Sequence, residues 1–370
     1  MLSTLRWAVA AVLALGSPAL AVAEPPGAQA LIERQRREKS PVWADGDTVT
    51  FFYRGQADQV DVIFGGDIRA LNRVADSDVW TLSVTLTDLE RAVFSYRFIL
   101  TAKDRPAERA AEPAVWRGPK APPAAAECAD LKGTLQQFEV ASRVLDSTRK
   151  VTVYRPPGHD PKKASPVVYA ADGEAIDRFA RVVEPLIAAG QVPPVVLIGV
   201  HSGGYVGGTP DFKKYDAQKD LRAQEYFPGL NPKRFSDHES FFCTEVPAWA
   251  ERRFGVSSEK AGRVVFGYSN GGRFAVEMGL RHPHLFGHVF GFSVAGNGTF
   301  DFGAGRKELP RFHLKAGTWE TSFHRCTSRL ADQLKERGAS VRFATRVGGH
   351  DTALWRDEFA AALVEAFGKK

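Results

Sequence analysis

Short, nearly continuous apolar runs alternate with helical segments in the second part of the chain. The apolar runs are 167–170, 195–200, 264–266 and 289–292, followed by the strand-like segments 311–317 and 341–345. The helical segments are 176–188, 246–254, 273–281, 326–337 and 355–367. Continuous apolar strands are typical of a parallel sheet that is covered on both faces. Their alternation with helices predicts an α/β domain over residues 131–370.

The first part of the chain has a different pattern, with short runs of β-branched and aromatic residues after a charged helical segment at 31–39. These runs are 48–53, 60–64, 80–84 and 94–99, and glycines and polar clusters separate them. Short strands with closely spaced turn signals predict a small β-sandwich over residues 41–104. Alanine, proline and charged residues dominate residues 105–130, which predicts a linker.

The first 23 residues predict a signal peptide. Arg6 precedes an apolar run that ends at Leu15, and Ala21-Val22-Ala23 offers small residues for cleavage. The run is too short to span a bilayer, and no later segment reaches 18 apolar residues. We therefore expect an exported protein, periplasmic or secreted, that does not insert into a membrane.

Composition narrows the classes of protein further. With 44% hydrophobic and 25% charged residues in 370, the chain has a globular composition, which excludes a disordered protein. The net charge is only +6 and no run of five like charges concentrates it, so we expect no nucleic-acid partner. Cys128, Cys243 and Cys326 permit at most one internal disulfide and lack metal-ligand spacing, so we expect no metal site.

The most informative segment is Gly267-Tyr268-Ser269-Asn270-Gly271, which lies between an apolar strand and a helix. It fits the G-x-S-x-G elbow that exposes a serine hydroxyl in α/β-hydrolases. The glycines are needed because side chains at those positions would collide across the sharp turn. Ser269 is therefore the predicted nucleophile.

A serine nucleophile needs a base and a group that orients the base, and in this fold the chain order is serine, acid, histidine. His350 follows the segment 341–345 and lies in a glycine-containing turn before the last helix, where the base is expected. The remaining downstream histidines lie in strands or at surface positions and are better explained by structural roles: His282, His284, His288, His313 and His324.

The acid should follow the strand at 311–317, and Glu320 is the predicted residue. Asp301, which comes after the preceding strand, is the alternative. Asp351 adjoins His350 and is badly placed to reach the second ring nitrogen.

The oxyanion hole needs two backbone N–H groups. One is expected from Asn270, and the other from the turn after the strand at 167–170, where Gly173 and Glu174 are both candidates.

At this level of detail the chain resembles the esterase D group of α/β-hydrolases, and within it the enterochelin esterases. The segments that carry the resemblance are Asp172-Gly173-Glu174, Arg222 with Glu225 and Tyr226, 267–272, 316–320, and 348–351 with Trp355-Arg356. Asp78-Val79-Trp80 and 94–98 are similar to the immunoglobulin-like module that precedes the catalytic domain in those enzymes. The resemblance implies a doubly wound, mostly parallel α/β-hydrolase sheet behind an immunoglobulin-like β-sandwich.

The resemblance also implies an acyl-enzyme mechanism on a small ester, either a siderophore-type trilactone, with or without iron, or a related aromatic ester. Arg222, Trp355 and Arg356 would then line a pocket that binds an acidic or aromatic acyl group. No cofactor is implied. The export signal departs from the cytoplasmic enterochelin esterases, and the stretch 203–219 is longer than is usual for the family.

Two other functions stay open at this stage. One is a feruloyl or acetyl esterase that acts on carbohydrate, with the front module contacting glycan. The other is a non-catalytic binding protein on a hydrolase scaffold. Because every predicted catalytic residue follows the linker, we also expect a fragment from about Leu131 onward to retain the catalytic residues in place.

Overall fold

The computed structural model describes residues 27–102, 105–109, 113–208, 215–303 and 308–368. The predicted signal peptide at 1–23 lies outside these ranges. The chain divides into two compact units. The first comprises the chain up to Pro123 together with Gly317–Thr321 and Arg346–Leu354, and the second comprises Ala124–Ala316, Ser322–Thr345 and Trp355–Lys370. Within the described ranges, no helix has the length and apolar character needed to cross a membrane.

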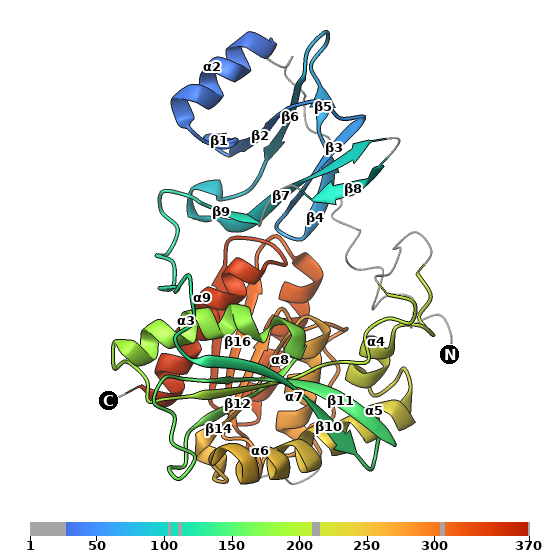
Figure 1. Cartoon of the computed structure of the whole chain (residues 1–370), viewed down its shortest axis with the longest axis vertical. Helices are drawn as coiled ribbons and strands as arrows, with labels where there is room; N and C mark the ends of the chain where they lie inside the picture. The colour runs from blue at the N-terminus through green and yellow to red at the C-terminus, as the bar shows by residue number, and fades with distance from the viewer. Residues whose placement is uncertain (1–26, 103–104, 110–112, 209–214, 304–307, 369–370) are drawn as a thin grey trace. The chain divides into compact units, whose positions relative to one another are not determined.

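The first unit contains a β-sandwich, coloured blue to teal in Figure 1, whose sheets have the strand orders β1-β2-β6-β5 and β4-β3-β7-β8, with β9 also paired to β7. Rings of Phe51, Phe64 and Phe94 meet in its core, with centroids 4.8–6.1 Å apart. The elements are α2 (Ala28–Glu38), β1 (Val42–Asp45), β2 (Thr48–Arg54), β3 (Gln59–Phe64), β4 (Asp67–Ala70), β5 (Asn72–Arg73), β6 (Val79–Thr85), β7 (Val93–Ala102), β8 (Arg105–Arg109) and β9 (Ala114–Arg117).

The sandwich extends into the segment for which the sequence predicts a linker. β8 and β9 both pair antiparallel with β7, and Trp116 on β9 stacks on Phe94 with ring centroids 5.1 Å apart. The predicted boundary at residue 104 therefore falls between strands of one sheet. β8 and β9 lie at the edge of the sheet, and an edge strand needs a partner on one side only. Such strands can therefore have the Ala- and Pro-rich composition that predicts a linker.

The second unit is built on a sheet with the strand order β10-β11-β13-β12-β14-β15-β16-β17. β13, β12, β14, β15 and β16 pair in parallel, whereas β11 is antiparallel to both β10 and β13. The strands are β10 (Thr134–Ser142), β11 (Ser147–Arg155), β12 (Val167–Ala171), β13 (Val196–Val200), β14 (Arg263–Tyr268), β15 (His288–Phe292), β16 (Arg311–Gly317) and β17 (Val341–Arg346).

Helices cover both faces of this sheet (Figure 1). Val168 and Ala170 of β12 belong to the same buried cluster as residues of α3 and α9, whereas Val167 and Tyr169 belong to the second cluster, which includes residues of α6, α7 and α8. The helices are α3 (Ile176–Ala188), α4 (Leu221–Tyr226), α5 (Pro232–Ser240), α6 (Val246–Phe254), α7 (Asn270–Arg281), α8 (Thr321–Glu336) and α9 (Thr352–Phe367). The predicted order along the chain, a β-sandwich followed by an α/β-hydrolase sheet, is confirmed.

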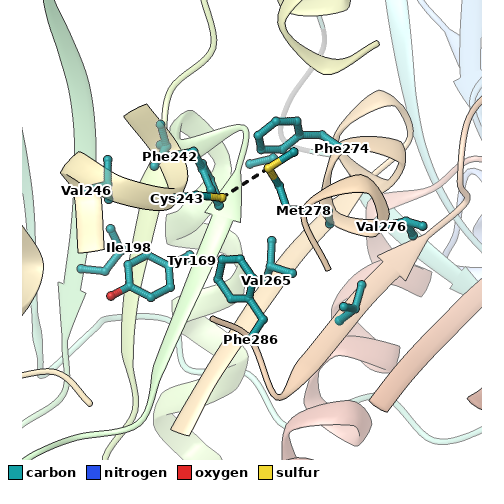
Figure 2. Close-up of a cluster of buried hydrophobic side chains, with 14 of the residues drawn as sticks. Tyr169, Ile198, Phe242, Cys243, Val246, Val265, Phe274, Val276, Met278 and Phe286 are labelled. Atoms are coloured by element: carbon teal, nitrogen blue, oxygen red, sulfur yellow. Dashed lines mark hydrogen bonds between the residues drawn. The ribbon is translucent and has the colours of Figure 1, made fainter. Parts of the chain in front are cut away.

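The three cysteines are free. Cys243 lies in a π-helical turn, Phe241–Glu245, between α5 and α6, and its thiol donates to the Met278 sulfur at 3.4 Å among buried rings (Figure 2). Burial raises the pKa of the Cys243 thiol well above its usual range. The thiol therefore stays protonated and serves as a packing group. It is unreactive, because the thiolate is the reactive form of cysteine.

His238 on α5 is buried among aromatic rings on the same face of the sheet. The rings of Tyr226 and Phe274 lie 5.6 Å and 5.0 Å from its imidazole, and its Nδ1 lies 3.8 Å from a Glu225 oxygen. Burial lowers the pKa of His238 to about 4, and the nearby Glu225 charge only partly opposes this effect. Burial lowers the pKa values of His288 and His313 to about 4 as well.

These histidines predict a loss of stability in acid. Each one is neutral in the folded chain but binds a proton in the unfolded chain below its ordinary pKa of 6.5. Between pH 6.5 and 4 the unfolded state therefore binds more protons, and the free energy of unfolding falls as the pH falls. Each histidine contributes a slope of up to about 1.4 kcal/mol per pH unit.

The substitution His238→Phe should flatten this pH dependence by removing one titrating group. Urea unfolding at several pH values between 7 and 4 measures it. The same substitution at the exposed His284 is the control and should keep the wild-type slope. Equal slopes for His238→Phe and wild type would show that His238 is already protonated in the folded chain.

Candidate active site

Ser269 occupies a strained turn between β14 and α7, in the second unit. Its φ of +57° and ψ of −126° lie in a region that L-residues rarely adopt. Backbone hydrogen bonds to the end of β15 and the residues after it hold the turn. Ser269 N–H donates to Phe292 O at 2.9 Å, and Ala295 N–H donates to Ser269 O at 3.2 Å. A Cβ at Gly267 would lie 2.0 Å from Gly271 O, so the turn requires glycine there. The segment has the local form of a nucleophile elbow.

Glu320 and His350 are hydrogen-bonded to each other in the first unit. His350 Nδ1 lies 2.7 Å from Glu320 Oε2, and Gly317 N–H donates to the other carboxylate oxygen at 2.5 Å. The Glu320 side chain is 3% exposed and that of His350 is 22% exposed. A carboxylate bonded at Nδ1 favours the tautomer with its proton on that nitrogen, and Nε2 is then the atom that can act as a base.

The competing acids have other partners. Asp301 is exposed and accepts from Gly303 N–H at 2.8 Å. Asp351 Oδ2 accepts from the Ser95 backbone N–H and hydroxyl. Of the two carboxylates that the sequence left open, Glu320 is therefore the one bonded to His350.

The other downstream histidines lie elsewhere. His282 Nε2 lies 2.8 Å from Glu239, His288 and His313 are buried in strands, and His324 Nε2 lies 3.3 Å from the Thr345 hydroxyl. These positions fit structural roles.

The predicted oxyanion-hole turn lies beside the elbow in the second unit. β12 pairs in parallel with β14, so the turns after both strands lie at the same sheet edge. A Cβ at Gly271 would lie 2.8 Å from Asp172 Oδ2, which places the two turns in direct contact. Gly173 is buried in a 3₁₀ turn, Gly173–Ala175, and Asn270 is the first residue of α7. Backbone N–H groups at such positions can stabilise an oxyanion.

Arg222 fixes this turn through a two-point ion pair. Its Nε and Nη2 donate to the two oxygens of Asp172 at 2.6 Å and 2.7 Å, and the Asp172 backbone N–H donates to Tyr226 Oη at 3.0 Å. Asp172 itself has a φ of +56°, which the bonds stabilise. The guanidinium predicted to contact substrate thus already holds the candidate oxyanion turn.

Trp355 and Arg356 also have partners within the second unit. The buried Trp355 ring stacks on Tyr268, with centroids 4.2 Å apart, and its indole N–H donates to Ser293 Oγ at 2.8 Å. Arg356 donates to Glu127 at 2.6 Å. Trp355 therefore packs against Tyr268, the residue before Ser269. The contact of Trp355 with substrate stays a prediction.

A buried carboxylate that the sequence did not single out for chemistry anchors a neighbouring loop. Glu225 is fully buried and accepts from two nitrogens of Arg149, at 3.1 Å and 2.7 Å, and from Gly203 N–H at 2.7 Å. Burial raises the pKa of Glu225, but the charge of His238 where that residue is protonated, the hydrogen bonds and charge of Arg149, and the bond from Gly203 N–H outweigh burial and lower the pKa overall. The pair fixes the beginning of the long stretch after β13, of which 209–214 lie outside the described residues.

Known proteins resemble this chain in sequence and fold. A family model described as "Putative esterase" matches residues 142–299, which include Ser269 and end before Glu320. A Bacillus subtilis (strain 168) protein, the uncharacterised YjcH, is 25% identical over 252 residues, which make up 62% of this chain and 96% of the relative.

The similarity in fold extends over both units. The ferric enterobactin esterase from Salmonella typhimurium is 19% identical with a TM-score of 0.68, covering 90% of this chain and 98% of that one. The enterobactin esterase from Shigella flexneri, crystallised in the presence of 2,3-di-hydroxy-N-benzoyl-serine, is 19% identical with a TM-score of 0.67, covering 90% and 97%. In fold this chain is therefore similar to the enterobactin esterases, and over residues 142–299 it matches the esterase family model.

Proposed function

We propose that the chain hydrolyses its ester through an acyl-enzyme, with Ser269 as nucleophile, His350 as general base and Glu320 as the residue that orients the base. The observation that carries this proposal is the 2.7 Å bond between Glu320 and His350, which leaves Nε2 as the basic nitrogen. The strained φ of Ser269 at the elbow supports the nucleophile. Together they supply a nucleophile and an oriented base.

In the proposed reaction, Ser269 Oγ attacks the ester carbonyl while His350 Nε2 takes its proton. The resulting imidazolium is stabilised by Glu320, and it returns the proton to the leaving alcohol as the acyl-enzyme forms. Water then repeats the sequence and releases the acid. The N–H groups of Asn270 and of either Gly173 or Glu174 stabilise the negative charge that develops on the carbonyl oxygen.

The proposed substrate is a siderophore-type trilactone or a related aromatic ester. Support comes from the fold, which is similar to enterobactin esterases over both the sandwich and the α/β unit, and one of the Shigella flexneri structures was determined in the presence of enterobactin. Export to the periplasm or beyond is part of the proposal and is supported by the sequence of residues 1–23.

A hydrolysis comparison tests the substrate class. The purified chain is assayed with ferric enterobactin, with 4-nitrophenyl acetate and with a feruloylated oligosaccharide. We expect the largest kcat/KM with the trilactone. A preference for the feruloylated sugar would assign the chain to carbohydrate esters, and hydrolysis of none of the three would reject the proposed activity.

Substitution of the nucleophile or the base should abolish most of the activity. Ser269→Ala and His350→Ala should each lower kcat on 4-nitrophenyl acetate by about 10⁴-fold, and the double variant should be little worse, because the two residues act as a unit. Steady-state kinetics on the single and double variants measures this. Losses that add up in the double variant would contradict the assignment.

Removal of the orienting carboxylate should be nearly as damaging. Glu320→Gln should cost roughly 10²–10⁴-fold in kcat with the fold intact, because the imidazole then loses the charge that stabilises its protonated form. Asp301→Asn is the matched control, since that carboxylate bonds only a local amide among the contacts described above. A larger loss in Asp301→Asn than in Glu320→Gln would show that the acid is Asp301.

A further inference from the structure

The segments that carry the proposed acid and base belong to the same compact unit as the β-sandwich. Gly317–Thr321 contains Glu320 and Arg346–Leu354 contains His350, and both group with the chain up to Pro123. The sequence places them more than 180 residues after the sandwich. Their contacts within this unit show what holds them.

The base segment is bonded to the sandwich on both sides of the His350 Cα. His350 N–H donates to Gly65 O at 2.9 Å. The next residue, Asp351, is 3% exposed, and its Oδ2 accepts from the backbone N–H and the hydroxyl of Ser95 at 2.7 Å and 2.8 Å. Asp351 Oδ1 accepts from Ala353 N–H at 2.8 Å, in the first turn of α9. One buried carboxylate thus links β7 of the sandwich to the beginning of the last helix.

The acid segment is bonded to the sandwich as well. The indole N–H of Trp319 donates to Thr87 O at 3.1 Å, and its ring lies 6.0 Å from that of Phe94 in the sandwich core. Trp319 N–H also donates to Gly348 O at 3.0 Å, which joins the acid segment to the base segment. The base segment also accepts a bond from the first residue of β7, since Val93 N–H donates to Val347 O at 3.0 Å.

The turn between β3 and β4 approaches the base so closely that it excludes a side chain. A Cβ at Gly66 would lie 2.8 Å from His350 O and 2.9 Å from His350 Cβ, and the φ of Gly66 is +88°. The sequence pattern indicates only a turn at Gly65-Gly66. The structure gives Gly66 a second role, which is to let the sandwich backbone reach the segment that carries His350.

We propose that the sandwich is a positioning part of the catalytic machinery, in which Ser95 and Asp351 fix the backbone that carries His350. The inference rests on the proposed function, since it needs His350 to be the base. Glu320 sets the rotation of the His350 imidazole, whereas the bonds made by Gly65, Ser95 and Asp351 set the position of the His350 Cα. A displacement of about 1 Å in a reacting group can cost about 10²-fold in rate.

A fragment from about Leu131 onward is therefore not expected to hold the catalytic residues in place. That fragment keeps Ser269, Glu320 and His350. It lacks the sandwich residues that bond His350 itself and the neighbours Trp319 and Asp351, because Gly65, Thr87 and Ser95 precede it. Loss of positioning lowers the chemical step for every ester. It therefore differs from loss of a substrate-binding wall, which would affect large esters more.

The test uses point variants of the full chain. Ser95→Ala removes one bond to Asp351, Ser95→Thr restores the hydroxyl, and Asp351→Asn removes the charge that both Ser95 donors bind. Ser83→Ala is the matched control, because it deletes a hydroxyl that bonds Thr50 Oγ1 at 2.9 Å inside the same sandwich. All are assayed with 4-nitrophenyl acetate and with ferric enterobactin.

We expect kcat to fall about 10-fold in Ser95→Ala and about 10²-fold in Asp351→Asn, by the same factor on both esters and with KM nearly unchanged. Ser95→Thr should recover most of the loss, and Ser83→Ala should stay within about twofold of wild type. The downfield proton resonance of the His350–Glu320 hydrogen bond should broaden in Ser95→Ala and Asp351→Asn but not in Ser83→Ala.

Each outcome decides a separate point. If wild-type hydrolysis depends on Ser269 but Ser95→Ala and Asp351→Asn match Ser83→Ala, the positioning role is wrong and the proposed function stands. A loss confined to ferric enterobactin would assign these residues to substrate binding. If wild-type hydrolysis does not depend on Ser269, the proposed function fails and the positioning role fails with it. Should Asp351→Asn not fold, the Ser95→Ala and Ser95→Thr pair still decides.

Discussion

The hydrogen bond between Glu320 and His350 imposes a requirement that much of the surrounding structure meets. The two residues lie on segments that follow different strands, β16 and β17, and neither segment has regular structure at the point of contact. A 2.7 Å bond between such segments persists only if both backbones are fixed. They are fixed by a bond from Trp319 N–H to Gly348 O, and by the sandwich strands and turns on which each segment rests.

Much of the α/β fold could be predicted from periodicity. The helices at Ile176–Ala188 and Val246–Phe254 have the bounds that their patterns predict, because each one buries a continuous apolar stripe. The strand at Arg311–Gly317 agrees for a related reason, since only its first residue is exposed. β10 was missed because most of its side chains are exposed, and β9 because it is short and lies in an Ala- and Pro-rich stretch.

Part of the candidate site could be predicted from the sequence, and part of it could not. Its acid could be selected from chain order, because the position after β16 is defined by topology, and the selected Glu320 is bonded to His350. Pairings between distant polar residues have no periodicity and leave no local pattern. The bond of Arg222 to Asp172 spans 50 positions, and nothing near either residue indicates whether the guanidinium binds a ligand or a turn.

The bond from Ser95 to Asp351 spans 256 positions, and this separation has a consequence for how the protein matures. During synthesis Ser95 in the sandwich emerges well before Asp351, the residue that it binds. Long-range contacts of this kind form late, after the intervening sequence has folded. A nascent chain can thus contain the elbow around Ser269 while the segment that carries His350 is not yet bonded to the sandwich.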